Sequence, residues 1–297
     1  MLILVSCEKD VTVKVPPQPV KLVINGITGI NTPFSVTVGK TAGILEPTSP
    51  QSYQVTNAMV QLYENNLLKD TLVFNVNSHT YDVKHNTIPK PGFTYLINVS
   101  APDFITAESA TITPADIIIE NVTTRANVRT DADGNMYDEV KIRFTDNASI
   151  SNYYLINLRR PFNGGNGNIH YEDIYCMHSM DKDIDRRNNA DPTDFENCID
   201  REFFMTDKYF NGMSKEMIVF IRHDDLKPVI NSFDNREYKA VVELNNITSD
   251  HYKYRRSYTA YQDAEENPFA EPVLLFTNVK NGYGIFSTYN LAIDTIR

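Results

Sequence analysis

Short segments in which apolar and polar residues alternate recur along the first third of the chain. Their spacing of about 10 to 15 residues is typical of an all-β domain. In the segment AMVQLYEN (58–65), Val60 and Leu62 fall on one face of an expected strand and Gln61 on the other. The other expected strands are KLVINGI from Lys21, FSVTV at 34–38, LLKDTLVFNV at 67–76, FTYLINV at 93–99 and ESATITPA at 108–115.

Turn residues separate these segments. Asn65-Asn66 and Pro91-Gly92 each predict a tight turn between two strands. The last segment closes near Pro114. We therefore expect residues 21–115 to form an immunoglobulin-like β-sandwich of antiparallel strands.

The remaining residues, 116–297, predict a second β-rich domain that carries a polar insertion at about 161–203. Tyrosines 254, 258 and 261 are spaced by three and four, which predicts one short helix near 251–264 with its tyrosine stripe in the core. The fold class is thus all-β, with two β-sandwich-like domains. The main segments are IIIENVTTRANV at 117–128, VKIRFTD at 140–146, NYYLINLRR at 152–160, MIVFIRHDD at 217–225, REYKAVVELNNIT at 236–248, VLLFTNV at 273–279 and GIFSTYNLAI at 284–293.

The charge of the chain argues against a nucleic-acid partner. The net charge is -10, and the resulting field repels a polyanion. The pairs Arg159-Arg160 and Arg255-Arg256 are too short to offset it, and we expect them to be solvated or salt-bridged. No apolar stretch approaches the roughly 18 residues of a transmembrane helix.

The opening of the chain resembles the processing site of a bacterial lipoprotein. Residues 4–7, Leu-Val-Ser-Cys, follow the lipobox pattern, in which the cysteine thiol receives a diacylglyceryl group. Met1 to Ser6 reads as the end of a truncated or late-started leader. Cys7 is therefore the expected lipidation site, and the proline-rich segment up to residue 20 is the expected tether.

The two other cysteines, Cys176 and Cys198, agree with an exported protein. Outside the cytosol they would most simply form a disulfide, which closes a polar loop and stabilises it by about 3 kcal/mol. The alternative is a metal site that uses both cysteines and His178. That site lacks a fourth ligand and the close cysteine spacing of zinc sites.

No catalytic constellation is found in the sequence, so we expect no enzymatic activity, no cofactor and no metal. The histidines form no HExxH motif. The segment HDD at 223–225 reads as a loop at the end of a strand. The segment DADG at 131–134 fits a hairpin turn better than a calcium loop, because Arg129 and Val140 would stand at the first and twelfth positions.

The insertion at 161–203 is the expected place for ligand contacts, because long loops on a rigid β scaffold concentrate binding residues. Tyr171 and Tyr175 could stack on sugars or other planar ligands. The alternative is that both tyrosines only anchor the loop. The glycine-rich segment at 164–167 reads as a hairpin tip.

The last hundred residues resemble a known family. The segment NPFAEPVLLFTNVKNGYGIFSTY (267–289), preceded by HYKYRRSY (251–258), is similar to the C-terminal signature of the DUF4249 family of Bacteroidetes lipoproteins. The segment FTDNASISNYYLINL (144–158), the lipobox and the two N-terminal strands LVINGIT and AMVQLYEN fit the same family. Glycine, proline, phenylalanine and asparagine dominate this signature, which is more typical of a fold than of a reaction.

The resemblance implies an outer-membrane lipoprotein of unknown function, with its soluble part on the cell surface or facing the periplasm. Members are usually encoded beside TonB-dependent receptor barrels, which implies an accessory ligand-binding or partner subunit of an uptake system. Two alternatives stay open at this point: a surface adhesin or structural lipoprotein, and a surface hydrolase.

Overall fold

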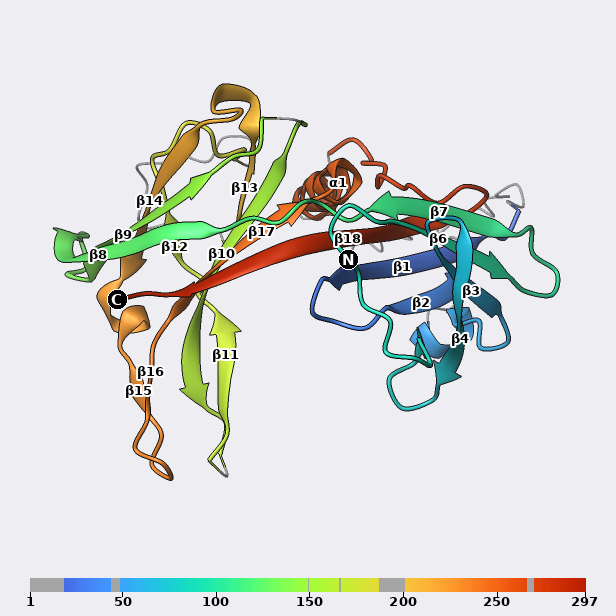
Figure 1. Cartoon of the computed structure of the whole chain (residues 1–297), viewed down its shortest axis with the longest axis horizontal. Helices are drawn as coiled ribbons and strands as arrows, with labels where there is room; N and C mark the ends of the chain where they lie inside the picture. Colours follow the sequence, from blue (N-terminus) through green and yellow to red (C-terminus); the bar gives the residue numbers. More distant parts are fainter. Residues whose placement is uncertain (1–18, 44–48, 149, 166, 187–200, 266–269) are drawn as a thin grey trace, which may run out of the picture.

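The computed structural model describes residues 19–43, 49–148, 150–165, 167–186, 201–265 and 270–297. Within these ranges the chain consists mainly of β-strands with one α-helix, so the all-β prediction is confirmed. Two lobes lie side by side, and the last strand, β18 (Tyr283–Thr295), runs through both of them (Figure 1).

The first lobe contains seven strands around one apolar core. Val60 and Leu62 are fully buried, as their alternation predicted. Tyr95 and Phe286 pack on Phe34 in the middle of the core. The strands are β1 (Leu22–Gly29), β2 (Ser35–Lys40), β3 (Met59–Glu64), β4 (Leu67–Asn75), β5 (Thr80–Asp82), β6 (Thr94–Ser100) and β7 (Ala107–Ile112).

Two turns of this lobe lie where the sequence predicts them. Asn65 and Asn66 have φ angles of 50° and 68° and join β3 to β4 as a tight hairpin. Gly92 has a φ of 77° in the turn before β6. Both predicted turns are confirmed.

The second lobe packs two sheets against each other. One sheet has the order β12-β14-β9-β8, and the other carries β11, β10, β17 and the second half of β18. Their facing side chains form a single core that includes Phe144, Tyr154 and Met217. The strands are β8 (Ile119–Thr130), β9 (Met136–Thr145), β10 (Tyr153–Asn163), β11 (Ile169–Asp173), β12 (Met177–His178), β13 (Phe203–Thr206), β14 (Ser214–Arg222), β15 (Val229–Ile230), β16 (Glu237–Tyr238) and β17 (Val241–Ile247).

Strand β18 joins the two lobes into one hydrogen-bonded sheet. Its first half pairs in parallel with β1, from Val23↔Tyr283 to Gly29↔Tyr289. Its second half pairs antiparallel with β17, from Ile247↔Tyr289 to Val241↔Thr295. The division of the chain at residue 115 stays a prediction, because β18 belongs to both lobes.

The connection between β7 and β8 is also fixed by hydrogen bonds. The side-chain amide of Asn246 donates to the carbonyl oxygen of Ala115 (3.1 Å), and that of Asn290 donates to a carboxylate oxygen of Asp116 (2.8 Å). Both asparagines are buried. This connection is therefore held against β17 and β18.

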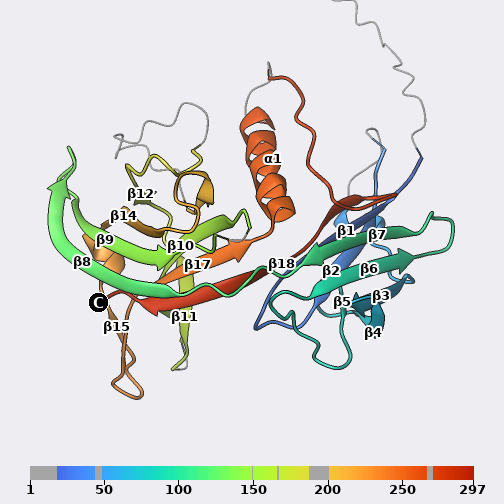
Figure 2. The ribbon, with the colours of Figure 1, turned by 45° about the horizontal axis from the view of Figure 1, so that its top comes forward.

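Helix α1 (Ser249–Glu265) confirms the predicted helix and lies on one side of β18 between the lobes (Figure 2). The hydroxyl of Thr248 accepts a hydrogen bond from the backbone N–H of His251 (3.1 Å) and caps the helix. His251 is its only buried residue, so the prediction that the tyrosine stripe faces the core was wrong. In the described ranges, no helix has the length and apolar character needed to cross a membrane.

The two apolar segments near the C-terminus differ in structure. Residues 284–293 lie in β18, whereas residues 273–279 form no strand. Asn278 explains the difference, because its side chain accepts from the backbone N–H of Phe286 (3.0 Å) and donates to its carbonyl oxygen (2.9 Å). The segment thus caps the edge of β18 with a side chain in place of a strand ladder.

Candidate functional site: a polar hollow beside helix α1

A hollow of about 470 Å³ lies between α1 and the second lobe. It is built from five stretches of chain: β10, the end of β11, residues 184–186, the segment around β13, and α1. Most of its lining side chains are polar or charged. They are Asn157, Asp173, Ile184, Asp185, Arg186, Arg201, Glu202, Phe203, Phe204, Arg255, Arg256, Tyr258, Thr259, Gln262 and Asp263.

One wall of the hollow is a single face of α1. Arg255, Thr259 and Gln262 follow each other at intervals of four and three residues, which places them on the same side of a helix. Tyr258 lies beside them, is 37% exposed and stacks on the ring of Tyr254 at 6.4 Å. The helix forms here because Thr248 caps it and because no glycine or proline interrupts residues 249–265.

Ion pairs tie this wall to the opposite side. The guanidinium of Arg255 donates to the carboxylate of Glu202, and that of Arg256 to the carboxylate of Asp185 (2.8 Å). The hydroxyl of Tyr252 also donates to Asp185, and burial followed by this bond raises the pKa of Tyr252. Asp185 therefore holds two side chains of α1 at once.

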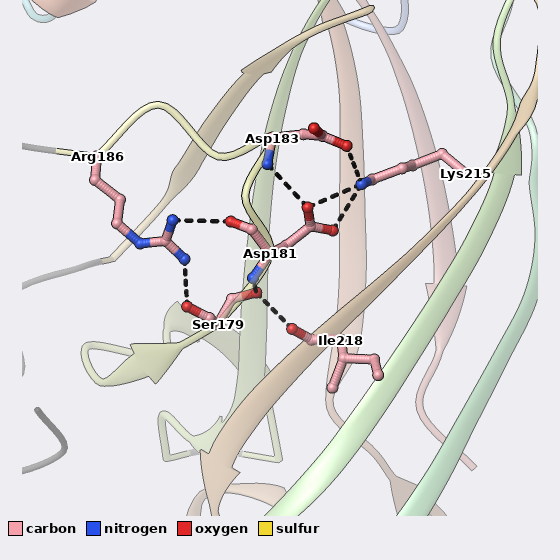
Figure 3. Close-up of polar contacts among 6 residues, drawn as sticks. All are labelled: Ser179, Asp181, Asp183, Arg186, Lys215 and Ile218. Atoms are coloured by element: carbon pink, nitrogen blue, oxygen red, sulfur yellow. Dashed lines mark hydrogen bonds and ion pairs between the residues drawn. The ribbon is translucent and has the colours of Figure 1, made fainter. Parts of the chain in front are cut away.

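The opposite wall includes residues 184–186, and the segment 179–186 that carries them is anchored by the buried ammonium group of Lys215 on β14 (Figure 3). Lys215 Nζ lies 2.8 Å from Asp181 Oδ2 and 2.5 Å from Asp183 Oδ2. All three side chains are at most 11% exposed. The hydroxyl of Ser179 donates to the carbonyl oxygen of Ile218 (2.6 Å) and fixes the start of the segment on the same strand.

The end of this segment is docked on β13. Ile184 forms a β-bridge with Met205, and the backbone N–H of Asp185 donates to the carbonyl oxygen of Phe204 (2.7 Å). The guanidinium of Arg186 turns back and donates to the carbonyl oxygens of Asp181 (2.8 Å) and Ser179 (Figure 3). The backbone that carries Asp185 is therefore held from both ends.

A small apolar cluster packs beside the hollow, and Phe204 belongs to both. Leu155, Phe204 and Ile247 are buried there, with Tyr252 packed against them. His251 lies nearby at the start of α1, and burial, followed by the charge of Arg255, lowers its pKa to about 3. Its imidazole is therefore neutral at physiological pH.

The charges around the hollow balance. Four arginines and four carboxylates line it, whereas the whole chain carries a net charge of -10. A charged ligand thus gains no net attraction from the lining, and a polar uncharged ligand meets both donors and acceptors.

The structure separates the two tyrosines that the sequence suggested for ligand contacts. Tyr175 contacts the hollow only through the lining residue Arg201, whose guanidinium stands 4.4 Å above its ring. Tyr171 belongs to β11, where its carbonyl oxygen accepts from Arg159 (2.7 Å). Burial, followed by the charge of the nearby Tyr238, raises the pKa of Tyr171. Its side chain is not part of the hollow's lining.

Two of the three cysteines, Cys7 and Cys198, lie outside the described ranges. The lipidation site and the Cys176–Cys198 disulfide therefore stay predictions. Cys176 lies between β11 and β12, with its Sγ 3.5 Å from Nε2 of His178. The described residues contain no group of three or more histidines, cysteines or carboxylates arranged to hold a metal ion.

Other motifs proved to be local structure. In the 131–134 turn between β8 and β9, both carboxylate oxygens of Asp131 accept bonds from Asn135, which confirms the hairpin. Segment 223–225 forms a 3-10 turn directly after β14, and its side chains diverge. His223 pairs with Asp138 (2.9 Å), whereas Asp225 binds Arg160.

The arginine pairs behave as the sequence indicated, and both are salt-bridged. The first pair, Arg159-Arg160, binds carboxylates on β11 and β17, and the second lines the hollow. The sequence did not single out Thr259 or Gln262. Their spacing from Arg255 on a predicted helix was the available signal.

The signature near the C-terminus has a structural role. Gly284 has a φ of 105°, and a Cβ there would lie 2.0 Å from the carbonyl oxygen of Ile24 on β1. The side-chain amide of Asn281 donates to the carbonyl oxygen of Thr106 (3.1 Å), and Lys280 pairs with Glu108 (2.7 Å). These residues attach the start of β18 to β1 and β7.

A known family matches almost the whole sequence. The model of a family described as "Domain of unknown function (DUF4249)" matches residues 8–292. No curated protein matches the sequence.

Proposed function

We propose that this chain, which belongs to the DUF4249 family, is a non-enzymatic binding protein that holds a ligand in the hollow beside α1. The observation that carries the proposal is the construction of the hollow. Its walls are fixed by ion pairs from α1 to Glu202 and Asp185, and by Lys215 behind them. Such rigid polar walls suit recognition, because little side-chain freedom is lost when a ligand binds.

We also propose that the protein is an outer-membrane lipoprotein that faces the cell surface or the periplasm. The sequence Leu-Val-Ser-Cys at 4–7 supports it, with Cys7 as the lipidated residue. Residues 11–20 would then space the first lobe from the membrane. Bacteroidetes are the bacteria in which this organisation is expected.

The proposed partner is a TonB-dependent receptor barrel, for which this chain would act as an accessory subunit in uptake. Family resemblance supports this role. A free-standing adhesin or structural lipoprotein is the alternative within the same compartment, and a surface hydrolase ranks below both.

Affinity purification of the full-length lipidated protein from gently solubilised outer membranes tests the partner. We expect a TonB-dependent barrel at near-equal stoichiometry when the recovered proteins are quantified by mass spectrometry. The control is the Cys7→Ser variant, which should lose incorporation of a labelled fatty acid and its membrane association. Recovery of the lipoprotein alone, from membranes rich in the barrel, would overturn the accessory role and favour the adhesin.

A further inference from the structure

We infer that the hollow beside α1 takes an uncharged, polyhydroxylated ligand, namely a segment of a neutral oligosaccharide. This inference rests on the proposed binding function and adds the chemical class of the ligand.

The charge balance argues against a charged ligand. Two of the four lining arginines are already paired with lining carboxylates, Arg255 with Glu202 and Arg256 with Asp185. The guanidinium of a third, Arg186, already donates to two backbone carbonyl oxygens. An anion would have to compete with these carboxylates, and a cation with the guanidinium groups. A ligand without charge leaves both pairs intact.

The lining chemistry argues against an apolar ligand. Its three purely apolar residues, Ile184, Phe203 and Phe204, are each at most 6% exposed. Their side chains therefore support the walls and offer little surface to a ligand. A ligand without hydrogen-bonding groups would displace water from polar walls without replacing its bonds.

The accessible groups match a row of sugar hydroxyls. Gln262 is exposed on α1 and presents an amide that both donates and accepts, and Thr259 adds a hydroxyl one turn before Asp263. A hydroxyl also donates and accepts, so paired donors and acceptors can engage adjacent hydroxyls without leaving a buried group unsatisfied. The volume of about 470 Å³ lies within the range of small-ligand sites.

One lining side chain adds a flat aromatic surface of the kind that packs on a sugar ring. Tyr258 is 37% exposed on the helix side of the hollow. Aromatic rings with a polar tip combine apolar contact with a hydrogen bond, which suits a ligand with C–H and O–H faces.

A glycan array probed with the full chain tests this inference. The array must carry neutral oligosaccharides, glycans with uronic or sialic acids, and glycans with free amines. We expect retention on neutral members. Tyr258→Ala and Gln262→Ala should each weaken binding by about tenfold, since each removes a contact worth roughly one hydrogen bond or stacked ring.

Tyr261→Ala is the matched control. Tyr261 lies on the same helix, bonds Glu265 (2.5 Å) and does not line the hollow. We expect this variant to bind within about twofold of the unmodified protein, as for an ordinary surface substitution. Circular dichroism confirms that all three variants fold.

Three results would overturn the inference. They are retention confined to acidic or amino glycans, no retention of any glycan, and equal weakening by Tyr258→Ala and Tyr261→Ala. The barrel purification reports separately on the partner. Glycan binding without a recovered barrel would therefore refute the accessory role and leave the ligand class standing.

Discussion

Gly284 is the residue on which the start of β18 depends most directly. A Cβ at this position would lie 2.0 Å from a backbone oxygen of β1, and its φ of 105° is unfavourable for other residues. We predict that Gly284→Ala lowers the free energy of unfolding by more than about 3 kcal/mol, because backbone strain and collision add. Urea unfolding followed by circular dichroism measures it.

Gly92 supplies the control for that substitution. Its φ is 77°, but a Cβ there would meet no atom within 4 Å. Gly92→Ala should therefore cost only the backbone term of about 1–2 kcal/mol. Equal losses in the two variants would show that close packing against Ile24 contributes nothing.

His251 predicts a pH dependence of stability. Its pKa falls from 6.5 to about 3 in the folded protein, first through burial and then through Arg255, and the Tyr289 ring lies 6.3 Å away. The unfolded chain therefore binds this proton first as the pH drops. Below about pH 6.5, and down to about pH 3, the imidazole should lower the free energy of unfolding by up to about 1.4 kcal/mol per pH unit.

The His251→Gln variant isolates this effect from the titration of the carboxylates. Glutamine does not titrate, so the free energy of unfolding of the variant should fall less steeply between pH 6.5 and 4. Urea titrations at a series of pH values measure both slopes. Parallel curves for the two proteins would contradict the assignment.

At the scale of elements, Lys215 fixes the wall of the hollow opposite α1. Lys215→Met would leave the carboxylates of Asp181 and Asp183, at most 11% exposed, without their counter-charge. We predict a loss of about 3–5 kcal/mol in the free energy of unfolding. The triple variant that adds Asp181→Asn and Asp183→Asn should regain part of it, because neutral amides need no ammonium group.

An exposed ion pair on the same lobe gives the comparison. Lys227 and Asp224 lie 2.6 Å apart with side chains 61% and 81% exposed, so Lys227→Met should leave the urea midpoint nearly unchanged. A similar shift for Lys227→Met and Lys215→Met would mean that burial of the network does not matter.

Local patterns predicted the elements well and their assembly poorly. Alternation in AMVQLYEN and the Asn65-Asn66 turn depend on neighbours in sequence, and the structure confirmed both. The parallel pairing of β1 with β18 joins residues about 260 positions apart, and no local pattern encodes such a partner. Hollow residues such as Asp185 and Gln262 lie far apart in the sequence and line one hollow only in the folded chain, so no local pattern marked them as a set.

At the scale of the whole molecule, β18 makes the two lobes a single cooperative unit. Its two halves complete the sheets of the two lobes. Loss of β18 from one lobe therefore also exposes a sheet edge in the other. We predict that Ile24→Ala, in the first lobe, lowers the unfolding midpoint by the same amount for amides of β3 and of β14. Hydrogen exchange read by mass spectrometry over a urea series measures both, and separate midpoints would contradict it.

The position of β18 also determines when the nascent chain can fold. While the ribosome is still adding residues before 283, β1 lacks its parallel neighbour and β17 has an open edge. Neither lobe can complete its sheet until β18 has been made, so folding waits for residues 283–295. For the exported lipoprotein proposed above, this delay would be an advantage, because a translocation pore accepts only an unfolded chain.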